Sequence, residues 1–275
     1  MRYIIYGAGA VGGAIGARLH QAGHDVLLIA RGEHGRAIAR AGLTFDAPEG
    51  RATLRIPVVD HPSGVAFRDD DVVFLCMKTQ HTEAALDDLE ACAGPGIPVV
   101  CAQNGVENER LAARRFAHVY AMLVYLPATH LEPGVVQVNS GPVTGVLDAG
   151  VYPSGADALM ERVTADLTSA TYLAEPRHDI MRWKYAKLLA NLANAVQALA
   201  GTQADIRDIV RALRDEAIAC YEAAGIAWAS NDEVRARTAL IQLRAVGDQV
   251  RGGSSSWQSL ARGTGSIEAD FLNGE

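Results

Sequence analysis

The chain is poor in cysteine, in aromatic residues and in basic charge. Its 275 residues include 4 cysteines, and aromatic residues make up 6% of the composition. A length of 275 residues excludes a disulfide-stapled small fold, and because no two cysteines form a Cys-x-x-Cys pair, free thiols in a reducing cytosol are expected. Acidic residues outnumber basic ones by 32 to 25, which gives a net charge of −7. Since this excess repels other anions, we expect no nucleic-acid partner and no anionic membrane partner.

Long uncharged apolar stretches and targeting segments are also missing. The sequence has no stretch that could span a bilayer, and it starts directly with a strand-like segment rather than a signal peptide. We therefore expect a cytoplasmic protein. The 8 histidines form neither an HExxH pattern nor a Cys/His cluster, and no GxSxG occurs. Neither a metal site nor a hydrolase nucleophile is predicted.

What is present is the composition of an ordinary globular protein, with 49% hydrophobic and 21% charged residues. The first half alternates helical stretches with short apolar runs at residues 3–6, 25–30, 72–77 and 98–102. This order predicts an α/β fold, an N-terminal Rossmann-type doubly wound sheet with right-handed crossovers. Alternating residues around a Pro-Glu-Gly turn at 42–59 predict an antiparallel hairpin inserted at the sheet edge.

The second half changes from strands to helices near Pro176. The pattern is helical from Asp179 onward, and Ser230 with Glu233 forms a capping box that opens a helix. We predict an all-α C-terminal domain, with ligands bound between the domains at the carboxyl ends of the strands. Before Pro176, further short strands are expected at residues 118–126, 134–139, 143–147 and 172–174.

A glycine-rich segment, GAGAVG, follows the first strand and opens a helix. In this context the pattern predicts a dinucleotide site, and the alternative is a purely structural turn. The first glycine permits a tight turn, the second lets the backbone approach a pyrophosphate, and the third allows close packing of helix and strand. The free N–H groups at the helix start would bind the anion. The predicted cofactor contacts are Gly7, Ala8, Gly9, Ala10, Val11 and Gly12.

The residue after the second strand distinguishes the two nicotinamide cofactors. An NAD site usually has Asp or Glu there, which hydrogen-bonds the ribose 2′-hydroxyl. Arg31 occupies this place, and a guanidinium suits a 2′-phosphate through charge-assisted hydrogen bonds. We therefore predict NADP as the cofactor. The alternatives are a solvated Arg31 and a ribose contact from Glu33.

Three polar residues share one face of a predicted helix. Lys187 and Asn191 are four residues apart, and Asn194 follows on the same line among leucines. A buried polar stripe needs a partner or a ligand. A lysine can donate the proton in the reduction of a keto acid when partial burial lowers its pKa from about 10.4. We predict this role for Lys187, against the alternative of an ordinary solvated lysine.

Five segments together resemble the ketopantoate reductase family: GAGAVGG at the start, CMKTQ, QNGVENE, WKYAKLLANLANA, and SSW with IEADFLNG near the end. The family comprises the NADPH-dependent 2-dehydropantoate 2-reductases of pantothenate synthesis. The resemblance covers the whole chain. It implies an NADP-binding Rossmann-like domain at 1–176 and a helical substrate domain at 177–275, with the active site between them.

Matched by position, the resemblance implies that Lys187 is the general acid and Asn191 a substrate ligand. It implies that Ser256 donates a hydrogen bond to the substrate, and that Glu268 is a catalytic partner of Lys187 that also faces the substrate or the nicotinamide. Lys78 and Asn104 would lie at the mouth of the cofactor and substrate site.

Some positions depart from the family pattern. Ala195 and Gly253 stand where asparagines are expected, and Asn194 could replace the first as a substrate ligand. Members usually continue through another helix beyond FLNGE, where this chain stops. The departures leave room for a relative of ketopantoate as substrate.

The expected function is reduction of a small 2-keto acid by NADPH, with ketopantoate to pantoate favoured. The alternatives are a reductase of another branched 2-keto acid, an opine-type dehydrogenase, and a catalytically silent NADP-binding regulator. The joint presence of Lys187, Asn191, Ser256 and Glu268 argues against the silent protein. A small-molecule substrate is the expected partner, and a homodimer is compatible with the sequence.

Overall fold

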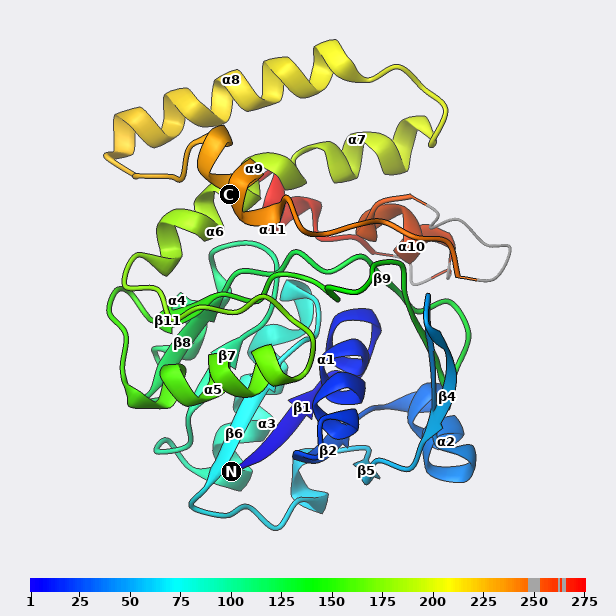
Figure 1. The fold of residues 1–275 in the computed structure, drawn as a ribbon. Helices are drawn as coiled ribbons and strands as arrows, with labels where there is room; N and C mark the ends of the chain where they lie inside the picture. Colours follow the sequence, from blue (N-terminus) through cyan, green and yellow to red (C-terminus); the bar gives the residue numbers. More distant parts are fainter. Residues whose placement is uncertain (247–252, 262, 264–265) are drawn as a thin grey trace.

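The computed structural model of the chain describes residues 1–246, 253–261, 263 and 266–275, and it places a sheet-containing part beneath a group of helices (Figure 1). The main sheet has seven strands in the order β11-β8-β7-β6-β1-β2-β5. All neighbouring strands are parallel except β11, which runs antiparallel to β8. The strands are β1 (Arg2–Tyr6), β2 (Asp25–Ile29), β5 (Val58–Val59), β6 (Asp71–Leu75), β7 (Val99–Cys101), β8 (Val119–Met122) and β11 (Ala149–Val151).

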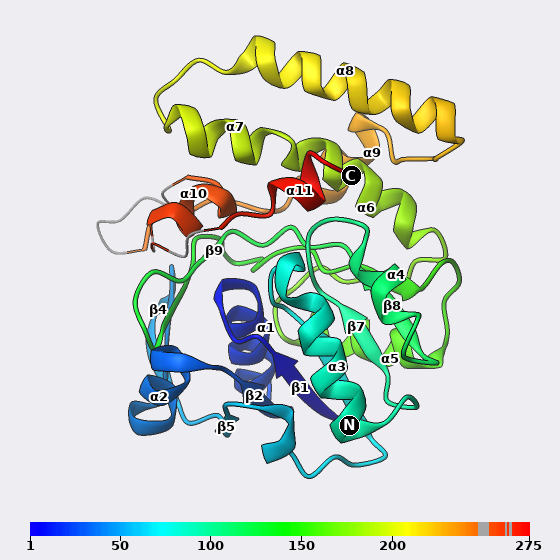
Figure 2. The same cartoon turned by 180° about the vertical axis from the view of Figure 1, so that it is seen from behind.

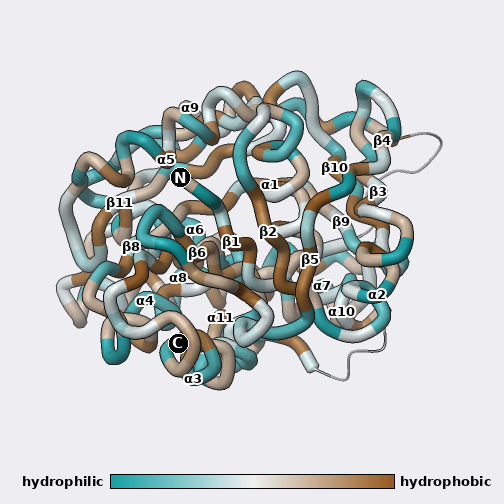
Figure 3. Tube along the Cα trace, turned by 90° about the horizontal axis from the view of Figure 1, so that it is seen from below, coloured by the Kyte–Doolittle hydropathy of each residue, from teal (hydrophilic) through white to brown (hydrophobic). Residues whose placement is uncertain are grey.

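Helices cover both faces of this sheet, as the alternating pattern predicts. Tyr3 and Ile5 of β1 belong to one core cluster, which α1 (Ala10–Gln21) and α5 (Ala158–Ser169) share. Ile4 and Tyr6 point the other way, into the cluster that α3 (Thr82–Ala93) and α4 (Asn108–Ala112) cover. Figure 2 shows α3 in front of the sheet from that side. Because its strands are buried on both faces, hydrophobic residues concentrate along β1, β2 and β6 (Figure 3).

The predicted hairpin is present, but it does not extend the main sheet. Strands β3 (Leu43–Ala47) and β4 (Gly50–Leu54) pair antiparallel, and β3 then pairs in parallel with β10 (Val135–Val138). With β9 (Ala128–Thr129) they form a separate four-stranded sheet, while β5 takes the edge of the main sheet. This second sheet contacts the outer side of α1 and shares its core cluster, so it buries a helix face that would otherwise be exposed.

Two other strand predictions are wrong. Residues 143–147 and 172–174 form only isolated bridges, between Tyr125 and Val146 and between Val146 and Leu173. Between them lies α5, a helix that the strand-rich reading of this region did not include. The remaining short elements of the sheet-containing part are α2 (Gly32–Ala41), η1 (Pro62–Gly64) and η2 (Thr79–His81).

The upper part is helical, as predicted from Asp179 onward. The capping box at the start of α9 is confirmed, since the Ser230 hydroxyl accepts from the Glu233 N–H and the Glu233 carboxylate accepts from the Ser230 N–H. None of the helices in the described ranges is both long and apolar enough to cross a membrane. The helices are α6 (Ile180–Asn191), α7 (Ala193–Ala200), α8 (Arg207–Ala224), α9 (Asn231–Thr238), α10 (Ser255–Ala261) and α11 (Ala269–Leu272).

Candidate active site

A cavity of about 1090 Å³ lies between the two parts of the molecule. Its floor consists of the segments that follow the carboxyl ends of β1, β2, β6, β7 and β8. Its roof consists of residues from α6, α7 and α10 and of Glu268, just before α11. This is the position at which doubly wound sheets bind ligands.

The glycine-rich turn has the backbone that its sequence predicts. Gly7 has φ +98°, and a Cβ there would lie 2.8 Å from the Met77 nitrogen. A Cβ on Gly12 would lie 2.3 Å from the Gly7 carbonyl oxygen, so only glycine allows this close approach. Around Gly9 no described atom lies within 4 Å of a built Cβ, which leaves the backbone accessible. The turn therefore forms an open cradle at the N-terminus of α1 that fits a pyrophosphate.

Of the two candidate cofactor residues after β2, Arg31 faces the cavity and Glu33 does not. Arg31 is the N-cap of α2 and lines the cavity. Glu33 is outside the described lining and accepts a hydrogen bond of 2.9 Å from Arg36 Nε on the surface. Partial burial and the positive charges of Arg31 and Lys78 lower the pKa of His81 at the same rim. Arg31 is thus better placed than Glu33 to meet a ligand.

A pair of histidines, which the sequence interpretation missed, supports the glycine-rich turn. His34 Nε2 lies 2.7 Å from the Ala8 carbonyl oxygen, and His34 Nδ1 accepts from the Gly134 N–H at 2.9 Å. These partners assign the proton to Nε2. The His130 ring packs on His34 with centroids 4.0 Å apart, and both rings line the cavity. No sequence motif marks them, because their partners come from the β9–β10 region about 100 residues away.

The predicted polar stripe faces the cavity, although the helix that carries it is interrupted. Lys187 and Asn191 belong to α6, whereas Asn194 belongs to α7, and Leu192 separates the two helices. Asn191 is 4% exposed, and its Nδ2 has no hydrogen-bond partner among the described residues. The Lys187 Nζ lies 3.9 Å from the centroid of the Tyr125 ring, a cation–π contact that the sequence did not predict.

The loops after β6 and β7 carry Lys78 and Asn104, and Glu268 of the roof contacts the first of these loops. The N–H and the hydroxyl of Thr79 donate to Glu268 Oε1 at 3.0 and 3.2 Å. This fixes a buried carboxylate beside the loop after β6. Lys78 Nζ contacts the Ser259 hydroxyl, so this loop also holds α10.

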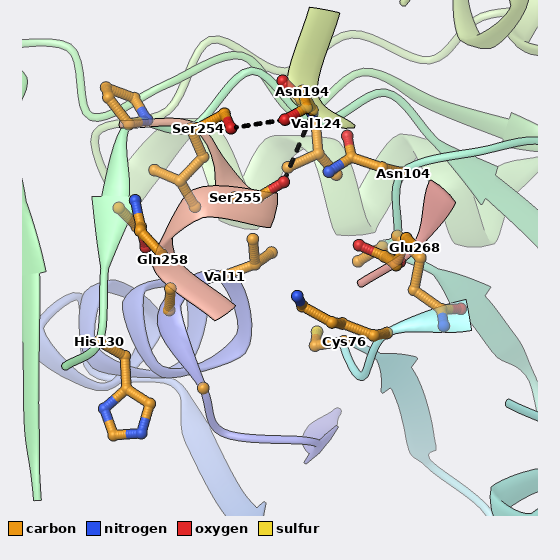
Figure 4. A pocket seen from close by; sticks show the side chains of 18 of the residues that line it. Val11, Cys76, Asn104, Val124, His130, Asn194, Ser254, Ser255, Gln258 and Glu268 are labelled. Atoms are coloured by element: carbon orange, nitrogen blue, oxygen red, sulfur yellow. Dashed lines mark hydrogen bonds between the residues drawn. The ribbon is translucent and has the colours of Figure 1, made fainter. Parts of the chain in front are cut away.

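The serine of α10 that lines the cavity is one position earlier in the sequence than predicted. Ser254 and Ser255 line the cavity, and Figure 4 shows both hydrogen-bonded to Asn194, across the cavity from Asn104 and Glu268. Ser256 is 2% exposed and lies outside the described lining. One residue is about 100° of helical rotation, which turns Ser256 into the interior. The structure therefore does not bring Ser256 to the cavity, and Ser255 stands there instead.

The cavity is electropositive although the chain is acidic. Its described lining carries four basic side chains and a single carboxylate, that of Glu268. The whole chain has a net charge of −7. A positively charged cleft concentrates anionic ligands even when the molecule as a whole is negatively charged. The basic residues are Arg31, Lys78, Lys187 and Arg244.

Known proteins resemble the chain over most or all of its length. The 2-dehydropantoate 2-reductase of Archaeoglobus fulgidus is 30% identical to the chain, over 99% of the chain and 88% of that protein. Among solved structures, a PanE/ApbA family ketopantoate reductase from Ralstonia eutropha JMP134 has a TM-score of 0.80 at 27% identity, over 100% of the chain and 89% of that protein. D-mandelate dehydrogenase in complex with NADH and anilino(oxo)acetate has a TM-score of 0.82 over 100% and 90%, and at 22% identity this shows a common fold.

The length of the matches differs among the relatives. The 2-dehydropantoate 2-reductases of Pyrococcus horikoshii and Pyrococcus abyssi are each 31% identical over 70% of the chain, and the chain spans 62% of their length. The family model described as Ketopantoate reductase PanE/ApbA matches residues 3–150, and the model of its C-terminal part matches residues 179–275. The chain belongs to the ketopantoate reductase (PanE/ApbA) family.

Proposed function

We propose that the chain reduces a small 2-keto acid with NADPH, and that 2-dehydropantoate, which yields pantoate, is the preferred substrate. The observation that carries this proposal is that one electropositive cavity joins the glycine-rich turn to Lys187, Asn191 and Glu268. A cofactor with phosphate groups and a substrate with a carboxylate are both anionic, so the charge of the lining suits the pair.

In this proposal the glycine-rich turn and the N-terminus of α1 hold the pyrophosphate, and Arg31 pairs with the 2′-phosphate. The open space at Gly9 and the exposed position of Arg31 on the cavity rim support this orientation. Lys78 and Asn104, in the loops after β6 and β7, would contact the cofactor, and Asn104 would also contact the substrate. When bound, the reduced nicotinamide supplies a hydride to the carbonyl carbon of the substrate.

Lys187 then donates a proton from Nζ to the carbonyl oxygen, which becomes the hydroxyl of the product. The Tyr125 ring beneath the ammonium group limits its movement, and burial raises the pKa of Tyr125 to about 12, so its hydroxyl stays neutral near pH 7. Asn191, buried with an unpartnered Nδ2 within the described chain, donates to the substrate.

The remaining predicted residues position the substrate. Glu268, held by Thr79, orients the substrate hydroxyl or the nicotinamide end. We retain a substrate contact from α10 and assign it to Ser255, with Ser256 as the alternative. Asn194 donates to Ser255 Oγ at 3.4 Å and acts on the substrate through this serine. Because Asn194 is occupied in this way and Ala195 offers no amide, another branched 2-keto acid is the second candidate substrate.

The test is a spectrophotometric assay of NADPH oxidation with ketopantoate and a panel of other 2-keto acids that includes aromatic and unbranched ones. The proposal expects the highest kcat/KM with ketopantoate and at least tenfold less with unbranched acids. NADH is run in parallel as the matched cofactor. Highest kcat/KM with another acid would correct the substrate, and no turnover with any acid would contradict the reductase function.

We also propose a domain division, a cellular location and an oligomeric state. We divide the chain into a cofactor domain at 1–176 and a substrate domain at 177–275. We place the protein in the cytoplasm because Cys76, Cys92, Cys101 and Cys220 are all free. We retain a homodimer because Leu199 of α7 is 85% exposed and Ile209 of α8 is 56% exposed, and light scattering of the purified protein tests this association.

A further inference from the structure

A buried ion pair lies directly beneath the cavity, and the mechanism above does not use it. Lys184 of α6 contacts Glu109 of α4 through Nζ and Oε1. The side chains are 3% and 0% exposed, which is unusual for lysine and glutamate. Burial raises the pKa of Glu109, and the Lys184 charge opposes this shift.

The pair links two parts of the candidate active site. Lys184 Nζ also donates to the Gln103 carbonyl oxygen at 3.0 Å, and Gln103 directly precedes Asn104. On α6, Lys184 comes three residues before Lys187, close to one helical turn. Both lysines, Gln103 and Asn104 line the same narrow gap against β8. A shift of Lys184 would therefore move both the loop of Asn104 and the turn of helix that carries Lys187.

The loop of Asn104 is also held from its other side. The Asn108 amide donates to the Asn104 carbonyl oxygen at 3.0 Å and to the Thr79 hydroxyl at 3.2 Å. Gln103 Nε2 donates to the Met77 carbonyl oxygen at 2.9 Å. Thr79 in turn holds Glu268. Lys184, paired with Glu109, thus links α6 through Gln103 to a buried polar network that reaches Glu268.

Stability alone does not account for such a pair. Desolvation of two charges commonly cancels their attraction, and apolar replacements are often neutral or stabilising. Glu109 Oε2 has no hydrogen-bond partner in the described part of the chain, so the network is incompletely satisfied. What the pair supplies beyond burial is a defined distance between α6 and the loop after β7.

We propose that Lys184 and Glu109 are positioning residues that set the place of Lys187 relative to Asn104. This rests on the proposed function for the roles of Lys187 and Asn104, whereas the ordering of the two segments is independent of it. Small displacements of reacting groups lower the rate strongly while binding is retained. The effect should therefore fall on kcat rather than on KM or cofactor affinity.

The test is the double variant Lys184→Met/Glu109→Leu, which removes both charges and keeps apolar volume. Thermal unfolding, kcat, KM and NADPH affinity by calorimetry are measured for the full chain. Hydrogen–deuterium exchange of residues 103–108 and 184–191 reports their order without any catalysis. The matched control is Arg182→Met: Arg182 lies on α6 like Lys184, but it pairs with Glu233 of α9, and neither residue belongs to the described cavity lining.

We expect the double variant to unfold within a few degrees of the wild type and to bind NADPH within about twofold. We expect kcat to fall about tenfold or more, with faster exchange in both segments. The control Arg182→Met should change neither kcat nor the exchange of the two segments. A double variant with wild-type kcat and exchange would overturn the proposal, because the pair would then contribute to packing alone.

A second variant, Glu109→Gln, covers the case in which the double variant does not fold. It keeps the shape and an acceptor for Lys184 but leaves its charge uncompensated. We expect faster exchange at residues 103–108 and a several-fold lower kcat, and unchanged values of both would overturn the proposal. Should the wild type reduce no keto acid, the proposed function fails, and exchange in the same variants still decides the positioning role.

Discussion

The two sides of the cavity are built on different principles. On the glycine-rich side, six consecutive residues form the cradle, and backbone conformation and a helix N-terminus do the binding. On the helical side, side chains from α6, α7, the start of α10 and the segment before α11 meet only through tertiary packing. The glycine-rich side should tolerate side-chain substitutions that leave the backbone conformation unchanged. The helical side depends on single side chains, so mutations there should have the larger effects on turnover.

The largest effect is expected at the helical side, from Lys187→Ala. Loss of the proton donor should lower kcat about 100-fold or more, because general acid catalysis is worth about 10²–10⁴-fold. NADPH affinity, which depends on the other side of the cavity, should stay nearly unchanged. Steady-state kinetics and calorimetric titration separate the two quantities. Retained turnover would remove Lys187 from the mechanism.

On the glycine-rich side the one side chain with a predicted specificity role is Arg31. Charge-assisted hydrogen bonds contribute about 1.5–3 kcal/mol, so we expect NADPH to be preferred over NADH by roughly tenfold to a hundredfold in kcat/KM. Arg31→Ala should remove most of this preference by weakening NADPH and leave NADH use little altered. Competition assays with both cofactors measure it.

The control for Arg31 is Arg36→Ala, because Arg36 is equally charged, lies on the same helix α2 and pairs with Glu33 away from the cavity. Its cofactor preference should equal that of the wild type. If the wild type binds NADH as tightly as NADPH, the role of Arg31 is wrong and Glu33 becomes the candidate for the ribose contact.

Local rules explain which parts of the fold the sequence predicts. Buried parallel strands, the glycine-rich turn and the Ser230 capping box are each encoded in contiguous residues, and all three are confirmed. The hairpin β3–β4 is also local, but its place in a second sheet depends on β10, about 90 residues later. Segment 143–147 has strand-like residues and forms single bridges, because it does not meet a continuous partner strand.

The same distinction applies to the candidate site. Lys187 and Asn191 face the cavity because their spacing follows helical geometry. Tyr125, His34 and Lys184 could not be found from sequence, since each is identified by a partner distant in the chain. The family resemblance implies Ser256 by sequence position alone, which does not specify the rotation of α10, and in the structure the adjacent Ser255 lines the cavity.

Two neighbouring serines of the helical side differ in position, since Ser255 lines the cavity and Ser256 lies in the interior. One hydrogen bond to the substrate contributes about 0.5–1.5 kcal/mol, so Ser255→Ala should raise KM for the keto acid about two- to tenfold. Ser256→Ala should change thermal stability and leave KM unaltered. Kinetics and calorimetry on both variants decide between the two. A raised KM in Ser256→Ala alone would restore the position implied by the family resemblance.

The smallest effect is expected at Glu233, at the start of α9 and outside the described cavity lining. Hydrogen bonds from Arg182 and from Ser230 lower its pKa to about 2, compared with 4.5 for the unperturbed group. A carboxyl group whose pKa is lowered by folding stabilises the folded state fully at pH values above 4.5. This stabilisation is lost as the pH falls toward 2. Glu233→Gln should therefore lower the Tm by a few degrees at pH 7, and the difference from the wild type should shrink below pH 4.5. Circular dichroism melts at pH 7, 5.5, 4 and 3 measure this, and a difference independent of pH would show that the cap acts without its charge.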